Sequence, residues 1–160
     1  MKRILFLLML IPALVAGQKG KPKLVVGVVV DQMRYDYLYR YWEKYSEQGF
    51  RRLVTKGFNF KNANYNYVPT YTAPGHACIY TGTTPSVNGI VSNDWYDRDH
   101  HKSVYCAEDT TTHPVGTHAL TSRMSPTRLL TTTVTDELRM ATNYQSKVVG
   151  IALKDRGAIL

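Results

Sequence analysis

The sequence predicts an α/β fold in which helices cover the faces of a parallel β-sheet. Two apolar runs, 24–30 and 147–153, have the continuous composition of strands buried on both faces. Helix signals lie between them, so strands and helices alternate along the chain. Ligands of such folds gather at the carboxyl ends of the strands. Asp31 and Lys154 directly follow the two runs, so we expect both at this edge of the sheet.

Local signals predict the helices between the two runs. Gly57 closes a helix over 49–56, as glycine commonly does at helix ends. Ser125, followed by proline, predicts the N-cap of a helix over about 126–141. The Tyr-rich segment 35–45 is predicted to be a helix that packs its rings on the sheet.

The remaining segments are assigned by composition. Residues 69–76 form a turn into a helix, with Pro74 in the first helical turn. Residues 58–67 are predicted to be a strand, and 82–89 a loop. The polar stretch 93–121 has poor periodicity and is expected to be an irregular surface excursion.

The first 17 residues have the layout of a secretory signal peptide. Lys2 and Arg3 precede an apolar run over 4–16, and small residues reach Gly17. The run is shorter than the ~20 residues of a membrane-spanning helix, which weighs against the alternative of a membrane anchor. We expect cleavage of residues 1–17, no stable membrane insertion afterwards, and a periplasmic or secreted protein.

The chain has a formal net charge of +8, from 20 Lys and Arg against 12 Asp and Glu. Such a balance favours anionic partners in general. The cations are scattered and form no Arg-rich stripe, so a small anionic substrate is expected rather than nucleic acid. Cys78 and Cys106 could pair in an exported protein, but their separation in sequence leaves the pairing open.

Asp31 and Thr72 could both carry chemistry. A carboxylate directly after a buried strand is costly unless it is paired or bound to metal, and a helix N-cap is an equal alternative. Thr72 stands at a helix start, where free N–H groups favour an anion. Its hydroxyl is either a cap, the commoner role, or a nucleophile whose proton a metal or base removes.

Three further residues suit a phosphoryl group. Lys154 and Arg156 alternate along the chain and would share one side of an extended segment. A lysine point charge beside an arginine fork matches phosphoryl oxygens, although a solvated charge cluster is commoner. Asn93 offers amide donors, although turn formation is its ordinary role.

The histidines are weaker candidates. His100, His101, His113 and His118 match no compact zinc motif and are expected to be mostly solvated. His76 is expected to be structural or to support the site indirectly.

Five short motifs occur in order between residues 30 and 156: VDQMR at 30–34, YTAPGH at 71–76, GTTP at 82–85, NDWYD at 93–97 and LKDR at 153–156. Together they closely resemble the secreted PafA-type alkaline phosphatases, a branch of the type I phosphodiesterase/nucleotide pyrophosphatase group within the alkaline phosphatase superfamily. The resemblance implies that residues 18–160 are the N-terminal portion of the parallel-sheet sandwich of that superfamily's catalytic domain.

The resemblance also implies a mechanism. Two zinc ions (Zn2+) would serve a complete active site, with Asp31 and Thr72 binding one of them. Thr72 would be the nucleophile and form a phospho-threonine intermediate. Asn93, Lys154 and Arg156 would hold the phosphoryl oxygens of a small phosphate monoester. The other metal ligands would lie beyond residue 160, so the segment alone is expected to be inactive.

Three alternatives differ in class. A sulfatase is disfavoured because Thr72 cannot give the aldehyde that sulfatases need. A phosphodiesterase shares the metals and the threonine, but a diester has one fewer charged oxygen for the Lys154 and Arg156 pair. A non-catalytic exported binding module would show neither metal nor turnover. The physiological ester and the oligomeric state stay open.

Overall fold

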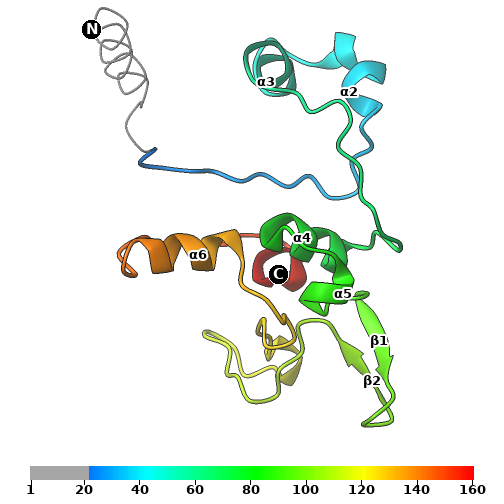
Figure 1. Ribbon diagram of the computed structural model, residues 1–160, viewed down its shortest axis with the longest axis vertical. Helices are drawn as coiled ribbons and strands as arrows, with labels where there is room; N and C mark the ends of the chain where they lie inside the picture. The colour runs from blue at the N-terminus through cyan, green and yellow to red at the C-terminus, as the bar shows by residue number, and fades with distance from the viewer. Residues whose placement is uncertain (1–21) are drawn as a thin grey trace, which may run out of the picture.

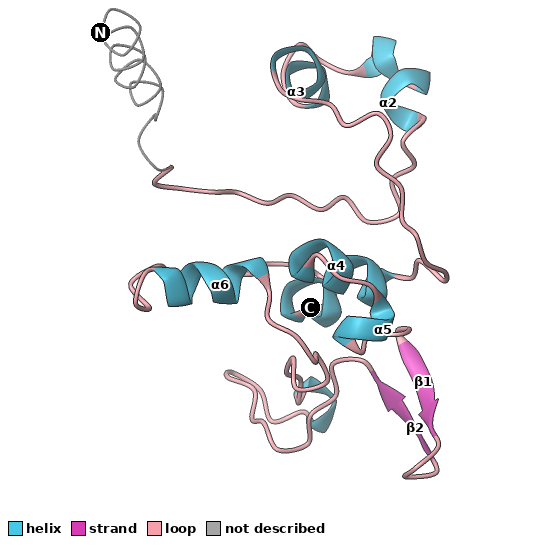
Figure 2. Cartoon of the chain, in the orientation of Figure 1, coloured by secondary structure: helices cyan, strands magenta, loops and turns pink. Residues whose placement is uncertain are grey.

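The computed structural model describes residues 22–160 (Figure 1), and the predicted signal peptide lies outside them. This part of the chain consists of short helices joined by long connections (Figure 2). Among its residues, no helix is long and apolar enough to cross a membrane. The elements in chain order are α2 Tyr37–Arg40, η1 Trp42–Lys44, α3 Phe50–Lys56, α4 Thr72–Thr81, α5 Pro85–Asn88, β1 Asp94–Asp97, β2 Lys102–Tyr105, η2 Leu120–Ser122, α6 Val134–Ala141 and α7 Asp155–Ile159.

The segment from α2 to α3 packs on itself and lies apart from the other elements (Figure 1). Arg51 holds it together, because its Nε and Nη2 donate to the carbonyl of Trp42 at 3.2 and 3.0 Å. The predicted helix over 35–45 is wrong in length: only α2 and the single turn of η1 form, because Tyr41 leaves the helical region at φ −107°. The helix closed by Gly57 is confirmed as α3.

The predicted strands are not paired within the described residues. Segments 24–30, 58–67 and 147–153 form no β-ladder there, and the first runs as a long extended trace (Figure 1). Parallel strands need hydrogen-bonding neighbours and covering helices on both faces. Neither is supplied by residues 22–160, so Leu24 is 79% exposed and Ile151 is 90% exposed.

The observed sheet lies where an irregular excursion was expected. Within residues 22–160 it has two strands, β1 and β2, which pair antiparallel with Asp94 opposite Tyr105 and Asp97 opposite Lys102. The loop expected over 82–89 contains α5, which ends at Gly89 in the left-handed region. Both differences arise from short elements whose pattern is too brief to show a period.

The helix predicted over 126–141 begins later, as α6. Ser125 is not its N-cap: its hydroxyl donates to Asp109 at 2.5 Å and accepts from the backbone of Thr127. The cap is Thr133, whose hydroxyl accepts from the backbone N–H of Asp136, while the Asp136 carboxylate accepts from the backbone N–H of Thr133. This reciprocal box satisfies two backbone donors that a helix start otherwise leaves free.

Small side chains of α4 form the centre of the core. Ala73 and Ala77 are fully buried against Ile90, Cys106 and Leu160, which come from three other segments. Small residues let the backbone of α4 approach its neighbours closely, and this approach brings the first turn of α4 beside the hairpin and α7. Cys106 and Cys78 are both buried and free, so the two cysteines do not pair.

Two glycines separate the effect of backbone strain from that of packing. Gly89 and Gly116 both have φ +82°, but a Cβ on Gly89 would lie 2.8 Å from Leu130 Cγ, whereas a Cβ on Gly116 meets no described atom within 4 Å. Gly116→Ala is therefore expected to lower the free energy of unfolding by about 1 kcal/mol through strain alone. Gly89→Ala should lower it by about 2–4 kcal/mol, because overpacking adds to the strain.

Urea unfolding of the full-length protein measures both glycine variants. Equal losses in the two variants would contradict the packing assigned to Gly89.

Candidate active site

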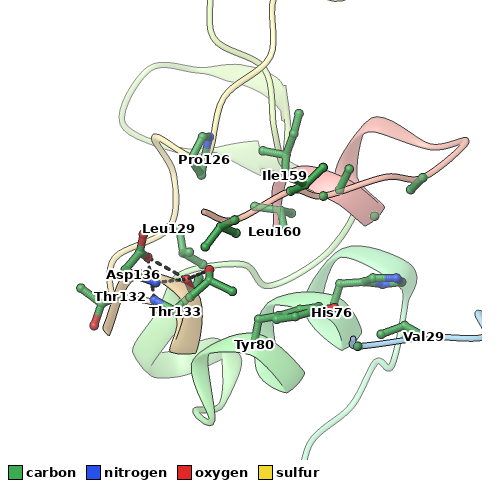
Figure 3. Close-up of a pocket in the computed structure, with 18 of the residues that line it drawn as sticks. Val29, His76, Tyr80, Pro126, Leu129, Thr132, Thr133, Asp136, Ile159 and Leu160 are labelled. Carbon is green, nitrogen blue, oxygen red and sulfur yellow. Dashed lines mark hydrogen bonds between the residues drawn. The ribbon is translucent and has the colours of Figure 1, made fainter. Parts of the chain in front are cut away.

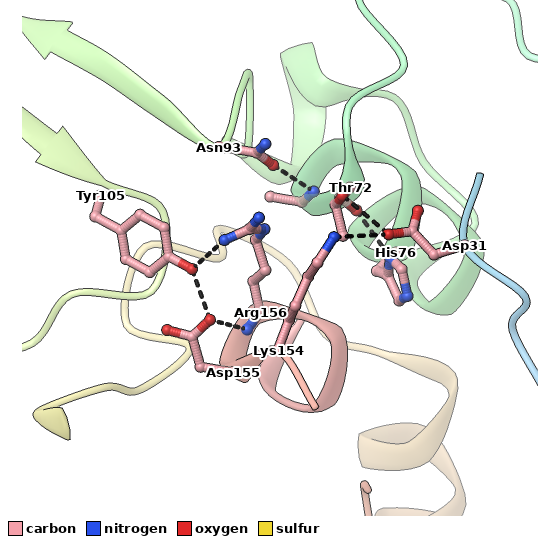
Figure 4. Close-up of polar contacts among 9 residues, drawn as sticks. Asp31, Thr72, His76, Asn93, Tyr105, Lys154, Asp155 and Arg156 are labelled. Atoms are coloured by element: carbon pink, nitrogen blue, oxygen red, sulfur yellow. Dashed lines mark hydrogen bonds and ion pairs between the residues drawn. The ribbon is translucent and has the colours of Figure 1, made fainter. Parts of the chain in front are cut away.

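The start of α4 is the centre of the candidate site (Figure 4). Tyr71 precedes the helix in an extended conformation, and Thr72 is the first helical residue. The helix of ten residues places free backbone N–H groups and the positive end of its dipole at this point. An anion that reaches Thr72 would therefore be stabilised by the backbone itself.

Asp31 meets Thr72 and Lys154 at a single oxygen. The Thr72 hydroxyl and the Lys154 ammonium both donate to Asp31 Oδ2, each at 3.2 Å. Burial raises the pKa of Asp31, but the hydrogen bonds from Lys154 and Thr72 outweigh it, so the net shift is downward. The Asp31 carboxylate is therefore ionised at neutral pH. It is not a helix cap, because the next helix, α2, begins only after Asp36.

Asn93 is oriented by α4 and by the hairpin. Its Oδ1 accepts from the backbone N–H of Ala73 at 2.9 Å, and its backbone carbonyl accepts from Cys106 N at 2.9 Å. With the amide oxygen used in this way, the Nδ2 group is the donor left for a ligand. Asn93 is therefore held beside the first turn of α4, as Figure 4 shows.

Lys154 and Arg156 lie at the start of α7 rather than on an extended segment. Lys154 is the N-cap residue and Arg156 is the second helical residue, so the expected alternation along a strand is wrong. Their side chains nevertheless point to the same region, toward Thr72 (Figure 4). The first turn of α7, rather than an extended segment, therefore places the side chains of Lys154 and Arg156 on the same side.

Arg156 makes contacts that the sequence did not suggest. Its Nη1 donates to the hydroxyl of Tyr105 at 2.7 Å, and that hydroxyl donates to Asp155 Oδ1 at 2.6 Å. The Nε atom is buried and has no hydrogen-bond partner among the described residues. Tyr105 and Asp155 thus join the site, although sequence reasoning assigned no role to Asp155 within its motif and no motif contains Tyr105.

His76 supports α4, as expected. Its Nδ1 lies 2.8 Å from the carbonyl of Thr72, one turn earlier, and the side chain is nearly buried. The other four histidines, His100, His101, His113 and His118, are exposed. His100 pairs with Asp97 at 2.8 Å.

Asp31 and Thr72 could hold a zinc ion together. Two oxygen ligands at about 2.0 Å in tetrahedral geometry lie about 3.3 Å apart, and the side-chain oxygens of Asp31 and Thr72 are 3.2 Å apart. A carboxylate is a common zinc ligand. Within residues 22–160 no group of three or more His, Cys, Asp and Glu side chains gathers, so a complete shell needs ligands from outside this part.

A cavity among the described residues lies elsewhere. It has a volume of about 640 Å³ and is lined by segments 24–30 and 147–153 together with α4, α6 and α7 (Figure 3). Its charged group, Asp136, is engaged with Thr133. Thr72, Asn93, Lys154 and Arg156 do not line it, so the cavity is a gap between unpaired apolar segments rather than the phosphate site.

Residues 25–152 match the protein family type I phosphodiesterase/nucleotide pyrophosphatase. The chain belongs to this family. This membership confirms the resemblance drawn from the five motifs.

Two curated relatives are similar over most of the chain. Alkaline phosphatase PafA of Elizabethkingia meningoseptica is 57% identical over 141 residues, which are 88% of this chain and 26% of that protein. A protein of Myroides odoratus named calcium-transporting ATPase is 54% identical over 92% of this chain and 27% of its own length. The chain spans about a quarter of the length of these relatives.

A solved structure agrees with the sequence matches. The crystal structure of wild-type PafA superposes with a TM-score of 0.86 at 55% identity, over 89% of this chain and 28% of that one. A variant of PafA in which a threonine is replaced by serine, and an asparagine, a lysine and an arginine by alanine, superposes equally well. The described residues therefore have the α/β fold of part of a PafA-type alkaline phosphatase, although they form no parallel ladder among themselves.

Proposed function

We propose that the protein to which these residues belong is a zinc-dependent phosphate monoesterase of the alkaline phosphatase type. The observation that carries the proposal is the convergence of Asp31, Thr72, Asn93, Lys154 and Arg156 around the start of α4 (Figure 4). These residues come from four segments separated by up to 125 positions, so their meeting is a property of the fold. Membership in the family and the two PafA structures support the same function.

The phosphoryl group would be bound by donors. Asn93 Nδ2, the Lys154 ammonium and the Arg156 guanidinium surround the position beside Thr72, and the N–H groups of α4 add to the positive field. Phosphoryl transfer requires mainly positioning and charge stabilisation. Two full cations match the doubly charged end of a monoester better than the single charge of a diester.

Thr72 would carry out the covalent step. Zinc held by Asp31 and Thr72, with a second zinc and further ligands from outside residues 22–160, would lower the proton affinity of the threonine hydroxyl and neutralise the leaving oxygen. The Thr72 oxygen attacks phosphorus, and the ester bond breaks to release the alcohol. Water then attacks the phospho-threonine, which releases inorganic phosphate and restores the hydroxyl.

The PafA variant supports the assignment of these residues. Its four substituted residue types, in chain order, are threonine, asparagine, lysine and arginine. Thr72, Asn93, Lys154 and Arg156 have the same types in the same order. A periplasmic or secreted location remains part of the proposal, on the signal-peptide pattern of residues 1–17.

Substrate preference tests the proposal against the phosphodiesterase alternative. The full-length protein should hydrolyse p-nitrophenyl phosphate with a kcat/KM at least about a hundredfold above that for bis-p-nitrophenyl phosphate, because Lys154 and Arg156 match two charged oxygens. Arg156→Ala should narrow this ratio. A higher kcat/KM on the diester would assign the protein to the phosphodiesterases.

Trapping of the intermediate tests the role of Thr72. Acid quenching during turnover, followed by peptide mass spectrometry, should place phosphate on Thr72, and Thr72→Ala should lower kcat/KM by about 10³-fold or more because the nucleophile is absent. Thr121→Ala serves as the control, since this exposed hydroxyl has no hydrogen-bond partner among residues 22–160. Phosphate on another residue, or full activity of Thr72→Ala, would contradict the assignment.

A further inference from the structure

Among the candidate phosphate-binding residues, Arg156 has a guanidinium that is held by a neighbouring side chain, Tyr105. Its guanidinium carries three groups that can donate, and the structure uses only Nη1, toward Tyr105, among the described residues. The centre of the guanidinium also lies 5.7 Å from the centre of the Tyr105 ring. One side of Arg156 is therefore held by Tyr105, while the other side points toward Asn93 and Thr72 (Figure 4).

Tyr105 can hold Arg156 because both functions of its hydroxyl are engaged. The oxygen accepts from Arg156 Nη1 and the hydrogen is donated to Asp155 Oδ1. Asp155 also accepts from the backbone N–H of Arg156 at 2.7 Å, at the positive end of α7. The hydroxyl thus stands between the arginine and the carboxylate, and keeps the guanidinium from a direct salt bridge with Asp155.

The protonation of Tyr105 suits this arrangement. Burial and the hydrogen bond to Asp155 raise the pKa of Tyr105 to about 12, although Arg156 acts in the opposite direction. The hydroxyl keeps its proton throughout the alkaline range in which such a phosphatase would work. It therefore remains a donor to Asp155 and a neutral acceptor for Arg156.

The hairpin gives Tyr105 a fixed position relative to Asn93. Tyr105 is the last residue of β2 and pairs with Asp94, the residue after Asn93. Arg128 Nε donates to the carbonyl of Tyr105 at 3.1 Å and holds the end of the strand. The hairpin thus connects Asn93, which directly precedes β1, with Tyr105, the last residue of β2, which supports Arg156.

We propose that Tyr105 is a positioning residue that aims Arg156 at the phosphoryl group and links its orientation to that of Asn93 through the β1–β2 hairpin. This inference rests on the proposed function. Removal of the hydroxyl would free the guanidinium to approach Asp155 directly. The arginine would then meet the substrate less often in the required orientation, and the transition state would be less well stabilised.

A double-mutant cycle on the full-length protein tests the inference, with kcat/KM for p-nitrophenyl phosphate as the measurement. Tyr105→Phe retains the ring and is expected to lower kcat/KM by about tenfold when Arg156 is present. In an Arg156→Ala background the same change should lower it by less than about twofold, because the residue that it orients is gone. Tyr144→Phe, at an exposed ring beyond α6, should leave kcat/KM unchanged.

The outcomes separate the two claims. Equal losses from Tyr105→Phe in both backgrounds, or no loss in either, would overturn the positioning role while the phosphatase assignment stands. A wild-type protein that turns over no phosphate ester would overturn the proposed function, and this inference with it. Thermal melting of each variant identifies any loss of activity that comes from unfolding. A purely structural defect of Tyr105→Phe would also lower kcat/KM equally with and without Arg156.

Discussion

Close packing around α4 determines where the hairpin, α7 and the candidate site lie relative to one another. Ala73 and Ala77 present so little side chain that the helix backbone can approach the hairpin and α7 directly. A larger side chain at either position would require the neighbouring segments to move apart. Thr72 would then be separated from Asn93 and Lys154, which are brought together by this approach and not by sequence proximity.

The same packing creates the electrostatic character of the site. Burial of Asp31 raises its pKa, but the hydrogen bonds from Lys154 and Thr72 outweigh burial, so the charged form is favoured and the pKa is lowered. Lys154 and Arg156 contribute two positive charges, and Asp31 and Asp155 contribute two negative ones. A phosphoryl group would therefore be favoured by the donors of Asn93, Lys154 and Arg156 and by the positive end of α4, and the apolar core beneath α4 holds these groups at fixed distances.

Local signals predicted part of the fold correctly. The end of α3 at Gly57 and the start of α4 follow from glycine, proline and capping preferences within a few residues. The strands predicted at 24–30 and 147–153 are unpaired within residues 22–160, because ladders depend on partners far away in sequence. The delayed start of α6 shows the opposite case, since Thr133 and Asp136 form a stronger cap than Ser125 provides.

The residues of the candidate site also differ in how far the sequence alone revealed them. Asp31, Thr72, Asn93, Lys154 and Arg156 were recognisable because each lies in a motif, and the structure brings them together. Tyr105 was not recognisable, because its importance comes from contacts with Asp155 and Arg156 about fifty residues later. A tyrosine at the end of a short strand has no local pattern that distinguishes it from the other tyrosines of this chain.

A crystal structure of the full-length protein with zinc and vanadate, measured with anomalous scattering at the zinc edge, tests directly whether Thr72 lies at the centre of a zinc and phosphate site. We expect a zinc peak about 2.0–2.2 Å from oxygens of Asp31 and Thr72, with vanadate oxygens hydrogen-bonded to Asn93, Lys154 and Arg156. Zinc or vanadate bound away from Thr72, or vanadate at Thr72 without contacts to Lys154 and Arg156, would contradict this assignment.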